Sequence, residues 1–156
     1  LTGESKDYAQ SLNQHSDVIL VTYYPRHNDG TVQEPTVVAT DFQTLVSLYP
    51  QKQIFFSEAG YPSGTQCNSS EAKQAQFVRE VFKAWDAHAN QIQFIHFSWL
   101  TDLSEVSVAE STQYYDSVDP CFVEFLSTLG LRTYSGSGTD KEAFRTLKAE
   151  AEARGW

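Results

Sequence analysis

The sequence of 156 residues contains no methionine, two cysteines and eleven lysine or arginine residues. A chain without methionine is not a primary translation product, so we expect a processed, recombinant or incomplete chain. Acidic residues number 20 and the formal net charge is −9, which argues against nucleic acid or an anionic membrane surface as a partner. No apolar run approaches the roughly 18 residues of a membrane span, so no membrane insertion is expected.

The two cysteines, Cys67 and Cys121, are too few for a disulfide framework and too far apart in sequence for a metal site. Two free buried thiols and a bridge between neighbouring loops are both open at this point. A bridge would indicate an oxidising compartment, extracellular or periplasmic. The four histidines lack ligand spacing and no phosphate-binding glycine loop is present. We therefore expect no metal and no cofactor.

Three apolar runs with strand propensity begin near residues 17, 53 and 92, and helical apolar spacing follows in 35–49 and 70–89. Runs without polar alternation are typical of strands buried on both faces of a parallel sheet. Their separations suit right-handed βαβ crossovers. The sequence thus predicts one α/β domain over 1–156. Because a (β/α)8 barrel takes about 250 residues, three strands could be its last three units or a small open sheet.

The remaining segments are less regular. Residues 101–119 are acidic and hydroxyl-rich, and a loop of this length suggests a functional role. A short helix is expected over 120–129 and a Gly/Ser-rich turn over 136–138. The run 139–142, Thr-Asp-Lys-Glu, fits a capping box that would open the last helix.

Glu58 stands at the carboxyl end of the middle strand run. A carboxylate there costs several kcal/mol unless it is paired or faces a cavity. It is either a strand-end Glu bonded to loop amides or a catalytic carboxylate, since active sites of α/β folds lie at this edge. By alternation, Phe56 should share its face. On the preceding strand either Tyr24 or Tyr23 should face the same way, and Trp99 ends the third run. A carboxylate, a tyrosine and a tryptophan together make a plausible sugar site.

At these residues the chain resembles a known family. The segments 21–25 (Val-Thr-Tyr-Tyr-Pro), 55–63 (Phe-Phe-Ser-Glu-Ala-Gly-Tyr-Pro-Ser) and 97–99 (Phe-Ser-Trp) resemble the last three strands of clan A glycoside hydrolases. These are retaining (β/α)8-barrel enzymes, and endo-galactanase-like and β-1,3-glucanase-like members come closest. The resemblance covers nearly the whole chain. It implies the C-terminal part of such a barrel and hydrolysis of O-glycosidic bonds in a poly- or oligosaccharide.

The resemblance also implies residue roles. Glu58 would be the nucleophile, Tyr24 (with Tyr23 as the fallback) would hydrogen-bond it, and Trp99 would lie under the sugar. The further candidates for substrate contact are Tyr23, Tyr61 and Asp102. Asp102 could bond sugar hydroxyls or could be an ordinary solvated loop residue.

One part of the family's site is missing from the sequence. Hydrolysis with retention of the anomeric configuration needs a second carboxyl about 5–5.5 Å from the nucleophile. The family supplies it from the end of the fourth barrel strand, which this chain lacks. Asp41 and Asp102 are the nearest alternatives in sequence, but Asp41 is better explained as a first-turn helix residue favoured by the helix dipole. The chain alone is expected to be inactive.

Three barrel strands would leave two open edges and an exposed apolar face. The remaining strands would come from a longer polypeptide, a second chain or self-association. Two rival hypotheses are a non-catalytic carbohydrate-binding or interaction module, and a small three-layer α/β enzyme that uses Glu58 as a general base.

Overall fold

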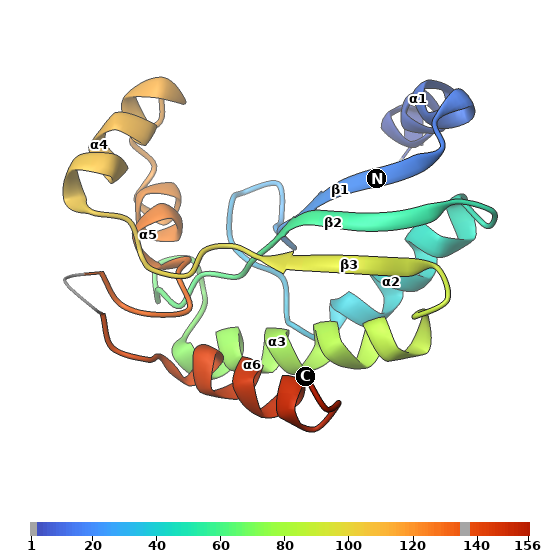
Figure 1. Ribbon diagram of the computed structural model, residues 1–156. Coiled ribbons are helices and arrows are strands. Elements are labelled where there is room, and N and C mark those ends of the chain that lie inside the picture. The colour runs from blue at the N-terminus through green and yellow to red at the C-terminus, as the bar shows by residue number, and fades with distance from the viewer. Residues whose placement is uncertain (1–2, 135–137) are drawn as a thin grey trace.

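The computed structural model describes residues 3–134 and 138–156, and its centre is a parallel three-stranded sheet (Figure 1). The strands are β1 (Val18–Tyr23), β2 (Gln53–Ala59) and β3 (Ile92–Phe97). They lie side by side in chain order, and a helix joins each to the next. This α/β arrangement of successive βα units is that of consecutive strands in a (β/α)8 barrel, as the sequence predicts.

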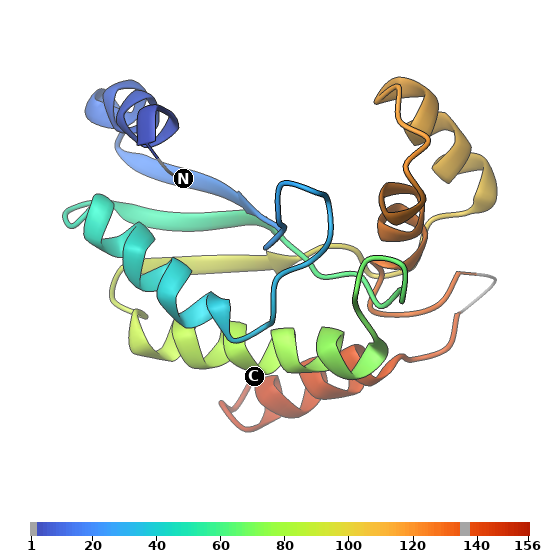
Figure 2. The ribbon, with the colours of Figure 1, turned by 180° about the vertical axis from the view of Figure 1, so that it is seen from behind.

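The helices are unevenly distributed around the sheet. Three of them, α2, α3 and α6, cover one face, α1 lies beside the amino end of β1, and α4 and α5 stand beyond the carboxyl ends of the strands (Figures 1 and 2). Their bounds are α1 Gly3–Leu12, α2 Val37–Leu48, α3 Glu71–Ala87, α4 Glu105–Tyr114, α5 Pro120–Thr128 and α6 Glu142–Glu152. Within the described ranges no helix is both long and apolar enough to cross a membrane.

The main core lies between the sheet and α2 and α3. Ile54 and Phe56 of β2 point into it and are fully buried. Phe42 of α2 stacks on Phe56 with ring centroids 4.5 Å apart. Burial of each such side chain stabilises the fold by about 1.5–3 kcal/mol. The helix-covered face therefore holds the three strands in place.

The opposite face of the sheet is uncovered. Leu20, Phe55 and Phe94 pair in register across the three strands, and Leu20 and Phe94 are 71% and 50% exposed. In the described part of the chain, β1 and β3 each have a strand neighbour on one side only. An apolar row on an open sheet is what the sequence predicts for a barrel fragment, because in a closed barrel this row would face the packed interior.

Two local expectations need correction. The expected loop over 101–119 contains helix α4, which begins because the Ser104 side chain accepts a hydrogen bond from Ser107 N. The expected capping box does not form: Lys141 precedes α6 without a side-chain cap, and Asp140 instead pairs with Arg132 and Lys148. The expected turn over 136–138 lies almost wholly outside the described residues.

Candidate active site

Glu58 and Tyr24 meet at the carboxyl ends of two neighbouring strands. Glu58 is the penultimate residue of β2, and Tyr24 directly follows β1. The Tyr24 hydroxyl donates to Glu58 Oε2 at 2.9 Å. Both side chains are half-buried. The hydrogen bond expected for one of the two adjacent tyrosines is thus made by Tyr24.

An irregularity in the strand pairing decides which way Glu58 points. Val21 pairs with Phe56, but the next residue, Thr22, pairs with Glu58, so Ser57 is an extra residue on β2. Such a bulge reverses the alternation of side chains beyond it. The expectation that Glu58 and Phe56 share a face is therefore wrong: Phe56 packs in the helix-covered core, whereas Glu58 reaches Tyr24.

The surroundings of Tyr24 keep its hydroxyl protonated. The ring packs edge-on against Phe125 of α5, with centroids 5.4 Å apart. Burial raises the pKa of Tyr24 far above its ordinary value, and the hydrogen bond to the Glu58 carboxylate raises it further. The hydroxyl is consequently a permanent donor that fixes one carboxylate oxygen of Glu58.

Gly60 lies in close contact with the ring of Tyr24. A Cβ atom at this position would lie 2.6 Å from Cε1 of Tyr24 and 2.7 Å from the carbonyl oxygen of Ser98. Only glycine allows the backbone after β2 to approach both groups so closely.

We expect Gly60→Ala to displace the Tyr24 ring and to lower the free energy of unfolding by about 1–3 kcal/mol, as overpacked sites do. Urea unfolding measures the stability, and a crystal structure of the variant measures the Tyr24 to Glu58 distance. Tyr24→Phe is the matched control, because it removes the hydroxyl and keeps the ring. A Gly60→Ala variant of unchanged stability with the 2.9 Å contact intact would contradict this account.

Trp99 lies at the same end of the sheet, two residues beyond β3. It is half-buried and packs, like Tyr24, against the apolar cluster of α4 and α5 that includes Phe125. The peptide bond between Ser98 and Trp99 is cis. Phe97, which strand alternation would place on the same face as Trp99, instead stacks on Phe82 of α3, with centroids 5.7 Å apart. The structure thus brings Trp99 into the same cluster as Tyr24.

The hydroxyls of Tyr23 and Tyr61 make their hydrogen bonds away from Glu58. The Tyr23 hydroxyl donates to Asp41 Oδ2 at 2.7 Å, one turn into α2. Tyr61 is 1% exposed and donates to the carbonyl oxygen of Gln33 at 2.6 Å. Burial raises the pKa of both tyrosines well above the ordinary value. A substrate cannot contact a side chain as buried as Tyr61, and Asp41 is explained by its tyrosine partner rather than by the helix dipole.

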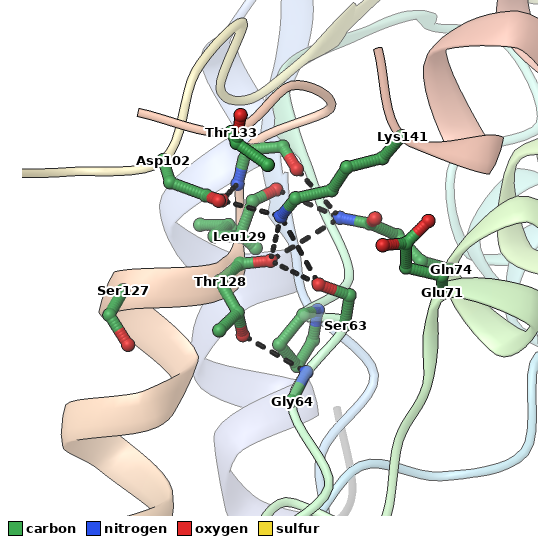
Figure 3. Close-up of polar contacts among 12 residues, drawn as sticks. Ser63, Gly64, Glu71, Gln74, Asp102, Ser127, Thr128, Leu129, Thr133 and Lys141 are labelled. Atoms are coloured by element: carbon green, nitrogen blue, oxygen red, sulfur yellow. Dashed lines mark hydrogen bonds and ion pairs between the residues drawn. The ribbon is translucent and has the colours of Figure 1, made fainter. Parts of the chain in front are cut away.

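Asp102 belongs to a buried polar network and is not a solvated loop residue (Figure 3). Lys141 Nζ lies 2.6 Å from Asp102 Oδ1, and the side chains are 4% and 12% exposed. Gly130 N donates to the same oxygen at 2.9 Å. Burial raises the pKa of Asp102, and the Lys141 ammonium opposes that rise. Lys141 also donates to Ser63 Oγ and the carbonyl oxygen of Thr128, both at 3.1 Å.

Sequence reasoning missed Gln74, which extends this network (Figure 3). Its side chain is 1% exposed, and Nε2 donates to the carbonyl oxygens of Tyr61 at 2.8 Å and Gly130 at 3.1 Å. The available signal was its position: Gln74 precedes Phe77 and Val78 at helical spacing, so it lies on the buried face of α3. A glutamine there needs backbone partners, and it joins the loop after β2 to the segment after α5.

A disulfide closes the same end of the molecule. Cys67, in the loop after β2, is bonded to Cys121 of α5 across 54 positions of sequence. Of the two possibilities that the sequence leaves open, two free buried thiols or a bridge, the structure shows the bridge. Because Phe125 of the same helix packs on Tyr24, the bridge also holds the wall of the Glu58 site in place.

These features define a class of fold and site: parallel βα units of a barrel, with a hydrogen-bonded carboxylate and a tryptophan at the carboxyl ends of the strands. No family model matches the chain, and no curated protein matches its sequence.

Two solved glycosidases share its fold. A thermostable mutant of a xylanase from Cellvibrio japonicus superposes with a TM-score of 0.58 and 13% identity, over 95% of this chain and 45% of the xylanase. A β-glucuronidase from an uncultured Clostridium sp. gives a TM-score of 0.54 and 16% identity, over 87% of this chain and 23% of that protein. The chain therefore has the fold of part of these (β/α)8 barrels and spans less than half the length of either neighbour.

Proposed function

We propose that this chain is the C-terminal part of the catalytic domain of a retaining glycosidase and supplies its nucleophile, Glu58. The observation that carries the proposal is the 2.9 Å hydrogen bond from Tyr24 to Glu58. It lies at the carboxyl ends of parallel strands, where the active sites of barrel enzymes are built. The glycosidase-like fold and the position of Trp99 support it.

In the proposed reaction the free oxygen of the Glu58 carboxylate attacks the anomeric carbon of a glycoside. The bond from that carbon to the leaving oxygen breaks, and an acid delivers a proton to the departing alcohol. Water then releases the sugar from Glu58 with retention of configuration. Tyr24 orients the carboxylate throughout, and Trp99 offers an apolar platform to the sugar ring.

The acid would come from outside this chain. A retaining pair needs a second carboxyl about 5–5.5 Å from the first. Asp102 is engaged with Lys141, and Asp41 with Tyr23. We propose that the remaining barrel strands, from a longer polypeptide, a second chain or self-association, supply the acid and cover the open face of the sheet. The Cys67–Cys121 disulfide supports an extracellular or periplasmic location.

Covalent labelling tests the nucleophile without the missing acid. A panel of 2,4-dinitrophenyl 2-deoxy-2-fluoro-β-glycosides (gluco, xylo and galacto) carries a leaving group that departs without protonation. We expect the peptide containing Glu58 to gain the mass of one fluorosugar as dinitrophenolate is released. Glu58→Gln should not be labelled, and Glu152→Gln, at the exposed end of α6, should be labelled like the unaltered chain.

Two results would reject the proposal: no labelling by any member of the panel, or labelling that persists in Glu58→Gln. The rival hypothesis of a non-catalytic carbohydrate-binding module makes a different prediction. In that case Trp99→Ala abolishes glycan binding, Glu58→Gln leaves it unchanged, and no label forms. The observation that supports this second candidate is that the chain spans less than half the length of either neighbour.

A further inference from the structure

The carboxyl end of α4 carries two exposed tyrosines that the proposed reaction does not use. Tyr114 is 82% exposed and Tyr115 is 61% exposed. Their rings meet edge to face with centroids 4.9 Å apart. α4 belongs to the segment that follows Trp99, at the end of the sheet where Glu58 lies (Figure 1). Two adjoining exposed rings there form an apolar surface close to the candidate site.

A continuous line of packed groups joins this surface to the site. The ring of Tyr115 contacts Phe122 at 5.5 Å between centroids. The Arg26 guanidinium lies over Phe122 at 5.9 Å and over Phe125 at 4.8 Å. Phe125 in turn contacts Tyr24, the partner of Glu58. The Tyr115 phenol is near enough to contribute to the raised pKa of Tyr24. The two exposed rings therefore continue the wall of the Glu58 site outward.

The charge of the segment limits which sugar polymer could lie there. Residues 105–119 contain four carboxylates and no basic residue. The carboxylates are Glu105, Glu110, Asp116 and Asp119. The Arg26 guanidinium over Phe122 offsets only one of these four negative charges, so a polymer of uronic or sulfated sugars is disfavoured relative to a neutral one. An aromatic ring also offers its face to the apolar C–H groups of a pyranose.

We propose that Tyr114 and Tyr115 form a further sugar-binding subsite, which holds a neutral polysaccharide chain extending from Glu58. The inference rests on the proposed function and deepens it. The substrate is then a polymer several sugar units long, and binding strength rises with the length of the oligosaccharide.

The experiment compares short and long probes on the full chain. Cello-, laminari-, xylo- and β-1,4-galacto-oligosaccharides of two and six units are titrated by isothermal calorimetry. We expect a hexasaccharide to bind more tightly than its disaccharide. Tyr115→Ala should weaken hexasaccharide binding about tenfold, the scale of a single aromatic contact, and should weaken disaccharide binding by less. Tyr115→Phe should retain the binding because it keeps the ring.

Tyr8→Ala is the matched control, since Tyr8 is 68% exposed on α1 at the far end of the sheet. The subsite is refuted if Tyr115→Ala and Tyr114→Ala both bind the hexasaccharide like the unaltered chain, or if no hexasaccharide binds. Labelling of Glu58 by the fluorosugars judges the nucleophile separately. A labelled Glu58 without a length effect would reject the subsite and keep the proposed function.

Discussion

Removing the Cys67–Cys121 disulfide should lower the free energy of unfolding by about 4 kcal/mol. The estimate follows from chain entropy: the bridge closes a loop of 54 residues, and a cross-link of this length restricts the unfolded chain by about that amount. Both cysteines are buried, so alanine is a suitable replacement. Urea unfolding of the Cys67→Ala/Cys121→Ala variant, compared with the oxidised and the reduced unaltered chain, gives the value.

The reduced unaltered chain is the control for the packing of the two side chains. If the double variant and the reduced chain unfold within about 1 kcal/mol of the oxidised chain, the bridge does not constrain the unfolded state as the chain-entropy relation requires. Because α5 carries both Cys121 and Phe125, we also expect slower fluorosugar labelling of Glu58 after reduction.

Lys141→Met should destabilise the fold by about 3–5 kcal/mol, the usual cost of removing one partner from a buried ion pair. The substitution leaves the carboxylate of Asp102 buried without its ammonium. Urea unfolding of the variant and of Lys141→Met/Asp102→Asn tests this, and the double variant should recover part of the loss because no unpaired charge remains. Lys148→Met is the matched control: Lys148 is half exposed in its pair with Asp140, and its loss should cost under about 1 kcal/mol.

The destabilisation by Lys141→Met should depend on pH. Burial already raises the pKa of Asp102 in the unaltered fold, and loss of the ammonium raises it further. A carboxyl whose pKa is higher in the folded state makes the fold less stable as the pH rises through that range. The deficit should therefore be largest at neutral pH and shrink in acid. A deficit that stays below about 0.5 kcal/mol at every pH would show that the pair contributes nothing.

Most of the fold could be predicted because its signals are local. Ile54 and Phe56 lie in an apolar run bounded by turn residues, and Phe42 and Val46 are spaced as one helix face. The residue pattern therefore indicates three strands and their crossover helices. The segment after the third strand was harder to predict. Helix α4 starts at a serine cap within a polar stretch, where the apolar periodicity gives little signal.

The roles of the candidate site residues stay predictions, and the structure adds the geometry in which they lie. Glu58 and Tyr24 were predicted from the segments Glu-Ala-Gly-Tyr-Pro-Ser and Tyr-Tyr-Pro. The extra residue Ser57 changes the face of the sheet on which Glu58 lies, and no local sequence pattern predicts such a bulge. The partners of Asp41 and Asp102 are distant in sequence. The sequence therefore suggested that Asp41 is favoured by the helix dipole and that Asp102 is either solvated or bonded to a sugar. Charges buried in this way are set by tertiary contacts that a linear pattern does not contain.

The serial order of the strands has a consequence for folding. Each strand pairs only with its predecessor and successor, so each step of sheet formation closes one crossover of moderate length. Parallel pairing across a whole helical crossover is non-local and therefore intrinsically slow, whereas the core that the strands share with α2 and α3 makes these βα units one cooperative region. In the described part of the chain the outer edges of β1 and β3 carry unpaired backbone groups, so the adjoining strands of the proposed barrel would pair with these two edges.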